Sequence, residues 1–181
     1  MKKLYPEFKE LTEFDDQACQ AAKYRSPIPF QNRCGDRAKI VVRLILHEAQ
    51  TKLLVFAGCL HSDVYADPSV FSALKDMIDR GVKLKVLLEE PLSAKTDRSE
   101  ALEFVLAQQG SGQVEVRQAS SAYQPQYKQQ ACHMMIADGS MLRIETGKEE
   151  FVATVCFNDP KMARVLEENF LTEGWAKGTC L

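Results

Sequence analysis

A strand–helix–strand pattern constrains the fold of this chain more than any other feature. Lys52–Ala57 has the length and apolar content of a buried strand, and Val82–Leu88 is a second such strand. Between them, Asp67 and Pro68 predict the start of a helix, because aspartate caps a first turn and proline fits its first position. Gly81 marks the end of that helix. The unit predicts two parallel strands joined by a right-handed crossover.

Similar signals extend this unit in both directions. They predict helices over 36–49, from a cap at Asp97 and from a cap at Asp159, and strands over Val114–Arg117, Cys132–Ala137, Met141–Glu145 and Phe151–Phe157. The pair Asp138-Gly139 predicts a hairpin turn between the two middle strands of this set. The fold class is therefore α/β, with a mixed β-sheet covered by helices on both faces.

The domain division follows from where this periodic pattern begins. Residues 35–181 form the predicted α/β domain, and residues 1–34 form an N-terminal helical and irregular extension. Within the extension, a helix over Glu7–Lys23 is expected to end before the prolines Pro27 and Pro29, which interrupt regular structure.

Composition limits the classes of function. The chain has 181 residues, 45% of them hydrophobic, and a net charge of −2, so it lacks the basic excess typical of nonspecific nucleic-acid binders. No apolar run approaches the roughly 20 residues that span a membrane, and the start MKKLYPEFKE is unlike a secretory leader. We therefore expect a cytoplasmic protein whose six cysteines are reduced. No cysteine pair has zinc-ligand spacing, and we expect neither a metal nor a cofactor.

Four consecutive segments resemble the phospholipase D superfamily. They are LLVFAGCL, DPSVFSALKDMIDRGVKLKVLLEE, CHMMIADGSMLRIE and CFNDPKMARVLEENFLTEGW, and the likeness covers roughly Asp36 to Trp175. The resemblance implies a phospholipase-D-like fold and phosphodiester chemistry by a His-x-Lys-x4-Asp motif. In that family the histidine attacks phosphorus, and the lysine and an asparagine neutralise the charge on the phosphoryl oxygens. A second histidine protonates the leaving group. With one such region per chain, the resemblance implies a homodimer acting on a phosphodiester or nucleic acid.

The motif itself is altered in this chain. When Asp138 is aligned with the motif's aspartate, Ala131 occupies the nucleophile position and His133 the lysine position. The Gly-Ser-x-Asn region reads Arg143-Ile144-Glu145-Thr146-Gly147-Lys148, which does not match it. Loss of one charge-stabilising group costs about 2.7–4 kcal/mol of barrier. We therefore expect impaired catalysis, with His133 and Asp138 as the catalytic candidates if activity remains.

Two groups of residues are candidates for ligand binding. His133 and Arg143 are expected to face each other across the hairpin, with Glu145 orienting one of them, as an anion site. The alternative for His133 is a half-buried histidine that bonds a backbone carbonyl. His61 and Glu89 follow predicted strands, where open α/β sheets place ligand-binding loops. With Glu90 and His133, these two residues are either part of a ligand site, of the metal or acid–base kind, or solvated loop ends.

Three functional hypotheses follow. The first is a catalytically impaired domain that binds a phosphate-bearing ligand or a protein partner. The second is a metal-independent phosphodiesterase or nuclease in which both subunits of a homodimer supply His133. The third is a structural or regulatory protein whose fold no longer binds phosphate.

Overall fold

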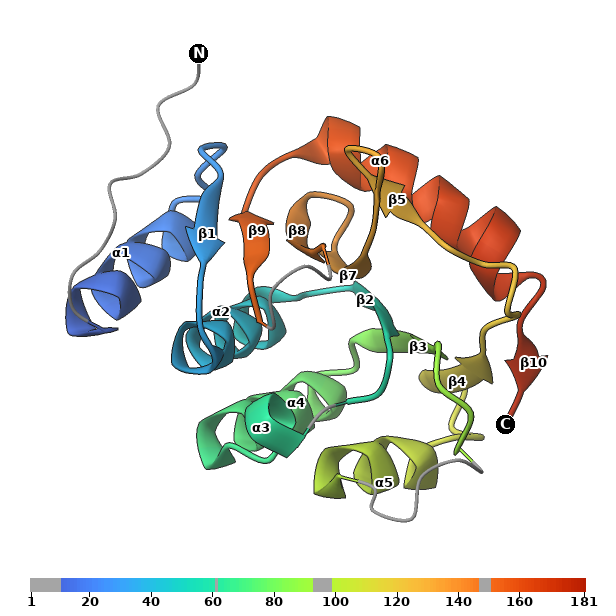
Figure 1. Cartoon of the computed structure of the whole chain (residues 1–181). Helices are drawn as coiled ribbons and strands as arrows, with labels where there is room; N and C mark the ends of the chain where they lie inside the picture. Colours follow the sequence, from blue (N-terminus) through green and yellow to red (C-terminus); the bar gives the residue numbers. More distant parts are fainter. Residues whose placement is uncertain (1–10, 61, 93–98, 147–150) are drawn as a thin grey trace.

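A mixed eight-stranded sheet organises the molecule (Figure 1). The computed structural model describes residues 11–60, 62–92, 99–146 and 151–181. Within these ranges the strands follow the order β1-β9-β8-β7-β2-β3-β4-β10, and β5 and β6 form a separate pair. The strands are β1 Phe30–Asn32, β2 Lys52–Ala57, β3 Lys83–Leu88, β4 Val114–Gln118, β5 Gln126–Tyr127, β6 Gln130–Ala131, β7 His133–Ala137, β8 Met141–Glu145, β9 Ala153–Cys156 and β10 Thr179–Cys180.

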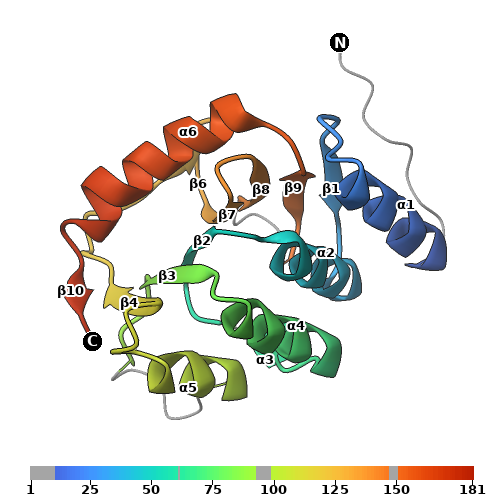
Figure 2. The ribbon, with the colours of Figure 1, turned by 180° about the vertical axis from the view of Figure 1, so that it is seen from behind.

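Helices cover both faces of the sheet, which confirms the predicted fold class (Figures 1 and 2). One face carries α1 Leu11–Lys23, α2 Gly35–Glu48, α3 Ser62–Tyr65, α4 Pro68–Asp79 and α5 Glu100–Ala107. The other face carries α6 Pro160–Asn169 and the π-helix η2 Phe170–Trp175. Trp175 is 7% exposed and stacks on Phe170, so it packs in the core of this second face.

The strand–helix–strand unit is confirmed. β2 and β3 pair in parallel, with Val55 opposite Val86, and α4 lies between them in the chain. Asp67 caps α4 by accepting hydrogen bonds from the backbone N–H groups of Ser69 and Val70. Successive side chains of the central strands point to opposite faces of the sheet, as expected. Val55 packs in the core on the face that α2 covers, and its neighbour Phe56 packs in the core on the face that α6 covers.

The sequence also predicted the capping residues at which two later helices, α6 and α5, begin. Asp159 caps α6 by accepting from the backbone N–H of Met162 at 3.0 Å, as its sequence indicated. α5 begins at Glu100, and the cap is the Ser99 hydroxyl, which accepts from Leu102 N. The expected cap at Asp97 lies outside the described residues.

Residues 11–34 pack on the rest of the molecule. Described residues of this segment form α1, which lies against α2, and β1, which pairs antiparallel with β9 through Phe30 and Val155. Strand β1 follows the two prolines and was not predicted, because three residues are too few to show a period. The boundary between an extension and a domain at residue 35 stays a prediction.

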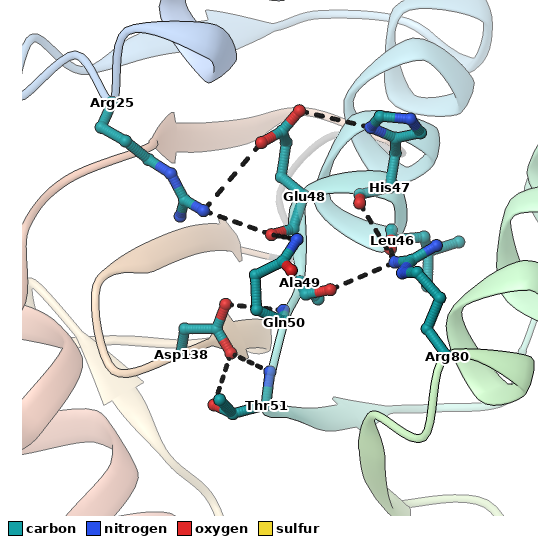
Figure 3. Close-up of polar contacts among 9 residues, drawn as sticks. All are labelled: Arg25, Leu46, His47, Glu48, Ala49, Gln50, Thr51, Arg80 and Asp138. Atoms are coloured by element: carbon teal, nitrogen blue, oxygen red, sulfur yellow. Dashed lines mark hydrogen bonds and ion pairs between the residues drawn. The ribbon is translucent and has the colours of Figure 1, made fainter.

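The hairpin turn between β7 and β8 forms as predicted and ties two parts of the sheet together. Asp138 and Gly139 have φ angles of +51° and +65°, the left-handed pair typical of tight hairpins. The Asp138 carboxylate accepts from the backbone N–H groups of Gln50 and Thr51 and from the Thr51 hydroxyl, at 2.8–2.9 Å (Figure 3). It also accepts from the backbone N–H of Lys52 at 3.1 Å. It therefore fixes the loop that leads into β2.

The neighbouring end of α2 is held in a similar way. Arg80 donates to the backbone carbonyls of Leu46, His47 and Ala49 at 2.9, 3.0 and 3.1 Å (Figure 3). These carbonyls lie at the C-terminus of the helix and lack partners within it. The Asp138 and Arg80 contacts together position the start of β2.

The Asp138 contacts predict a pH-dependent contribution to stability. Partial burial raises the pKa of Asp138, but the hydrogen bonds from Thr51, Lys52 and Gln50 outweigh it and the net pKa lies below the ordinary value. A carboxyl with a lowered native pKa stabilises the fold above its ordinary pKa, and this stabilisation disappears as pH falls through the native value. Asp138→Asn should reduce the free energy of unfolding by about 1–2 kcal/mol at pH 7, since the carboxylate is partly exposed.

Urea denaturation of both proteins between pH 7 and pH 3 measures this contribution. The difference between them should shrink as the solution becomes acidic. Asp79→Asn is the matched control, because Asp79 is exposed and has no polar partner among the described residues. A pH-independent difference would contradict the assigned role of Asp138.

Candidate ligand-binding site

Strand direction brings the candidate residues to one edge of the sheet. β2 and β3 are parallel and end at this edge, whereas β7 is antiparallel to β2 and begins there. His133, the first residue of β7, therefore lies beside Glu89 and Glu90, which follow β3. This edge is also where open α/β sheets place their binding loops.

His133 is held by an acidic partner and an aromatic ring. Its Nε2 lies 2.8 Å from Glu89 Oε2, and its ring packs edge-on against Phe56 at 5.4 Å between centroids. The side chain is 38% exposed and that of Glu89 is 50% exposed. His133 is thus partly buried, and its partner is a carboxylate rather than the backbone carbonyl or Arg143.

Arg143 and Glu145 form an ion pair beneath this edge. They are two residues apart on β8, and the register places Arg143 opposite Met135 and Glu145 opposite His133, so all four side chains share one face. Arg143 Nη2 lies 2.8 Å from Glu145 Oε2. Glu145 is therefore the partner of Arg143 on this face, and the register places His133 opposite Glu145 rather than opposite Arg143.

Arg143 is both buried and incompletely paired. Its side chain is 9% exposed, and its Nε–H has no hydrogen-bond partner in the part of the chain that the structure describes. A guanidinium carries five N–H donors, and the Glu145 carboxylate is its one polar partner among residues 11–60, 62–92, 99–146 and 151–181. Because buried polar groups are normally satisfied, this deficit is unusual for a purely structural arginine.

A cavity of about 180 Å³ opens beside these residues. Polar groups on its lining come from Tyr65, Glu90, His133, Arg143 and Glu145. Burial raises the pKa of Tyr65 to about 12, so its hydroxyl stays protonated at neutral pH. That hydroxyl contacts the Met135 sulfur at 3.8 Å, a weak interaction that leaves it able to bond a ligand.

The walls of the cavity are otherwise apolar. They come from the start of β7, the end of β2, the helices α2 and α3, and Phe151, and they include Val42, Val55, Ala57, Val64, Met134 and Met135. Apolar walls with a few convergent polar groups are typical of small-molecule sites.

The charges around the cavity are mostly negative. Among the described residues on its lining, Arg143 contributes +1, and Glu90 and Glu145 contribute −2, which leaves −1 with His133 neutral and no net charge with it protonated. No lysine lines the cavity among the described residues. The cavity therefore offers hydrogen-bond donors to an acceptor group of a ligand, but it lacks the net positive charge that would stabilise a bound phosphodiester.

Two predicted site residues do not join this group. Asp138 follows the other end of β7, about 16 Å of strand away from His133, where it bonds the loop before β2. His61 lies outside the described residues. Ala131, at the motif's nucleophile position, lies in β6 on a separate cavity of about 250 Å³ that His133 also lines.

Sequence reasoning missed Tyr65 and Gly58. Tyr65 ends the four-residue helix α3, which is too short to show a helical period. A Cβ atom at Gly58 would lie 2.8 Å from Glu90 Oε1 and 3.5 Å from His133 Cε1, so glycine allows these side chains to approach. Its place directly after β2 was the available signal.

Solved structures share this fold. Nuc from Salmonella typhimurium, described as a phospholipase D family member, has a TM-score of 0.57 at 20% identity over 84% of this chain and 95% of its own. NucT from Helicobacter pylori gives 0.53 at 10% identity over 81% and 92% of the two chains. TrmBL2, described as an archaeal chromatin protein with a novel mode of DNA binding, gives 0.60 at 19% identity over 88% and 55%. The chain therefore has the phospholipase D fold, which confirms the predicted resemblance.

A family model defines the chain more closely. The chain belongs to the family described as "Domain of unknown function (DUF7931)", whose model matches residues 35–180. The search of curated proteins found no match. Among the described residues, none of the helices has the length and apolar content to cross a membrane, and histidine, cysteine and acidic side chains form no group of three suited to a metal ion.

The Arg143–Glu145 pair predicts a characteristic mutational pattern. Arg143→Met should lower the free energy of unfolding by about 1–3 kcal/mol, because it leaves the Glu145 carboxylate without its partner in a partly buried position. The double variant Arg143→Met/Glu145→Leu should recover at least half of that loss, since apolar replacement of a buried ion pair is often neutral or stabilising. Urea denaturation measures both effects. A double variant less stable than either single variant would contradict this expectation, because it would show that the ion pair makes a net contribution to the stability of the fold.

Proposed function

We propose that this protein is a non-hydrolytic domain of the phospholipase D fold that binds a small ligand at Arg143. The ligand presents an acceptor group, a carboxylate or a terminal phosphate, to the guanidinium. One observation carries the proposal: Arg143 is 9% exposed, lines a cavity of about 180 Å³, and has one polar partner among the described residues. A bound acceptor would satisfy a donor whose burial otherwise costs about 1–3 kcal/mol.

The side chains at the motif's positions favour binding over hydrolysis. Ala131 has no nucleophile, and the Nε2 atom of His133 is held by Glu89 at 2.8 Å. Phosphodiester cleavage also needs positively charged groups beside the phosphoryl oxygens, which carry negative charge in the transition state. The cavity supplies one arginine, and Glu145 already pairs with it.

The charge distribution also argues against nucleic acid as the ligand. TrmBL2 is described as binding DNA, but that description belongs to that protein. This chain has a net charge of −2, and its cavity edge carries Glu89 and Glu90. A protein that neutralises phosphates needs several lysines or arginines along one surface. The expected homodimer and cytoplasmic location stay predictions.

The absence of catalysis is directly testable. The protein should not hydrolyse bis-p-nitrophenyl phosphate or single-stranded DNA above the buffer rate in the presence of EDTA. Light scattering at micromolar concentration on the same sample determines whether it is a dimer. Metal-independent turnover that disappears in His133→Ala would instead establish the active phosphodiesterase and overturn the non-hydrolytic proposal.

Ligand binding should depend on Arg143. Calorimetric titration with 3-methylbutanoate and with inorganic phosphate tests the two acceptor groups separately. At least one should bind, and Arg143→Met should weaken that binding at least tenfold, because the acceptor loses its charged donor. Lys161→Met is the control for loss of a positive charge, because Lys161 is an exposed residue of α6, and it should leave the affinity unchanged. Equal affinities of the wild type and Arg143→Met would contradict the proposed site.

A further inference from the structure

The hydrogen-bond donors on the cavity lining point to a more specific ligand. Resting on the function proposed above, we infer that the ligand is a small monocarboxylic acid with an apolar body. Its carboxylate accepts hydrogen bonds from the Arg143 guanidinium and from the Tyr65 hydroxyl, and its body lies against the valine side chains of the cavity. Arg143 comes from β8 and Tyr65 from the end of α3, and both line the cavity of about 180 Å³.

The first support is the position of Tyr65 beside Arg143. The Tyr65 hydroxyl lies 3.8 Å from the Met135 sulfur, and the register places Met135 directly opposite Arg143 on the same face of the sheet. Burial is the main influence on the pKa of Tyr65 and raises it, and the charge of Arg143 acts against this effect, as expected of neighbouring groups. A charged donor and a neutral donor therefore lie close together on the cavity lining.

The second support is that both donors have capacity for a ligand. Arg143 Nη2 lies 2.8 Å from Glu145 Oε2, and the Nε–H of Arg143 has no partner within the described ranges. A thioether is a weak acceptor, so the contact with Met135 leaves the Tyr65 hydroxyl available. A carboxylate has two oxygens, and a hydrogen bond between two charged groups is about twice as strong as a neutral one. One carboxylate can therefore serve both donors.

The third support is the charge on the lining. Among the described lining residues, Arg143 contributes +1, and Glu90 and Glu145 contribute −2. Each of these two carboxylates repels a bound anion in proportion to the charge of that anion. A phosphate monoester carries about −1.5 to −2 at pH 7 and has three terminal oxygens that need donors, whereas a carboxylate has a single negative charge and two oxygens. Of the two acceptor groups in the proposed function, the lining therefore favours the carboxylate.

The fourth support is the size of the cavity and the chemistry of its walls. A cavity of about 150 Å³ accommodates a molecule such as benzene, so about 180 Å³ has room for roughly six to nine heavy atoms. After the carboxylate is placed, this volume leaves room for a body of about three to six carbon atoms. Val42, Val55 and Val64 supply apolar contacts for such a body.

Matched ligands test the inference. Calorimetric titrations at pH 7 compare pentanoate with propyl phosphate, which has a chain of equal length, and with the neutral pentanamide. A second set consists of 3-methylbutanoate, isopropyl phosphate and 3-methylbutanamide. At least one of the two acids should bind at least tenfold more tightly than its matched phosphate and its matched amide. Acetate, which lacks the apolar body, should bind at least tenfold more weakly than that acid.

Removal of one oxygen atom tests the assignment of Tyr65. Tyr65→Phe should weaken the binding of that acid at least fivefold, because the carboxylate loses one of its two donors while the cavity keeps its shape. Tyr24→Phe is the matched control, since Tyr24 is 69% exposed directly after α1, and it should leave the affinity unchanged. Loss of the weak contact with Met135 should leave the fold of Tyr65→Phe intact, which circular dichroism checks.

The outcomes separate this inference from the function on which it rests. If in both sets the matched phosphate binds within tenfold of its acid or more tightly, and Arg143→Met weakens this binding, the inference is overturned and the proposed function is kept. The same conclusion follows if the amides or acetate bind within tenfold of the acids. No binding by any of these ligands overturns both. A loss of less than fivefold in Tyr65→Phe overturns the assignment of the second donor to Tyr65.

Discussion

The antiparallel pairing of β7 with β2 determines where the candidate ligand-binding site lies. Leu53 to Phe56 pair with Ala137 to Met134 in the middle of a sheet whose β2, β3 and β4 are parallel. Because β7 runs against β2, its first residue lies where β2 and β3 end. His133 thereby meets Glu89, which is 44 residues earlier in the chain. A slip of one residue would turn His133 and Arg143 to the other face, so the site depends on this register.

Asp138 holds that register from the opposite end of β7. Its carboxylate bonds three successive backbone N–H groups before and at the start of β2, and Lys52 O accepts from Asp138 N at 3.1 Å. The motif-like aspartate therefore positions the strand on which His133 lies, and its contribution to the site is indirect. Asp138 has this structural role whichever residues occupy the other positions of the motif. It stabilises the fold whether or not the chain catalyses a reaction.

The sequence predicted the elements whose signals are local. Asp67-Pro68 and Asp159-Pro160 located the starts of two helices, and Asp138-Gly139 located the hairpin, because caps and tight turns depend on a few adjacent residues. The hairpin register then follows, so Arg143 and Glu145 could be placed on one face of β8. The resemblance to phospholipase D supplied the fold that joins these elements.

Other features depend on contacts that adjacent residues do not encode. The strands β1 and β10 have three and two residues and exist only because an edge of the sheet is available to them. The partner of His133 could not be chosen among Arg143, a carbonyl and Glu89, since all three choices suit an imidazole. The burial of Arg143 was equally hidden, because an arginine in a hairpin is exposed more often than buried.

Under the proposed function, the buried ion pair and its acidic surroundings disfavour the cleavage of phosphodiesters at this site. A carboxylate about 5 Å from a bound anion repels it by about 3 kcal/mol at an effective dielectric constant of 20. Glu145 neutralises Arg143, so the cavity has no excess positive charge to offset repulsion from Glu90. Replacing Ala131 by histidine would restore a nucleophile in the sequence but would leave this repulsion in place. Under the proposed function, the absence of phosphodiesterase chemistry reflects the acidic surroundings of Arg143 as much as the absence of a reactive group at Ala131.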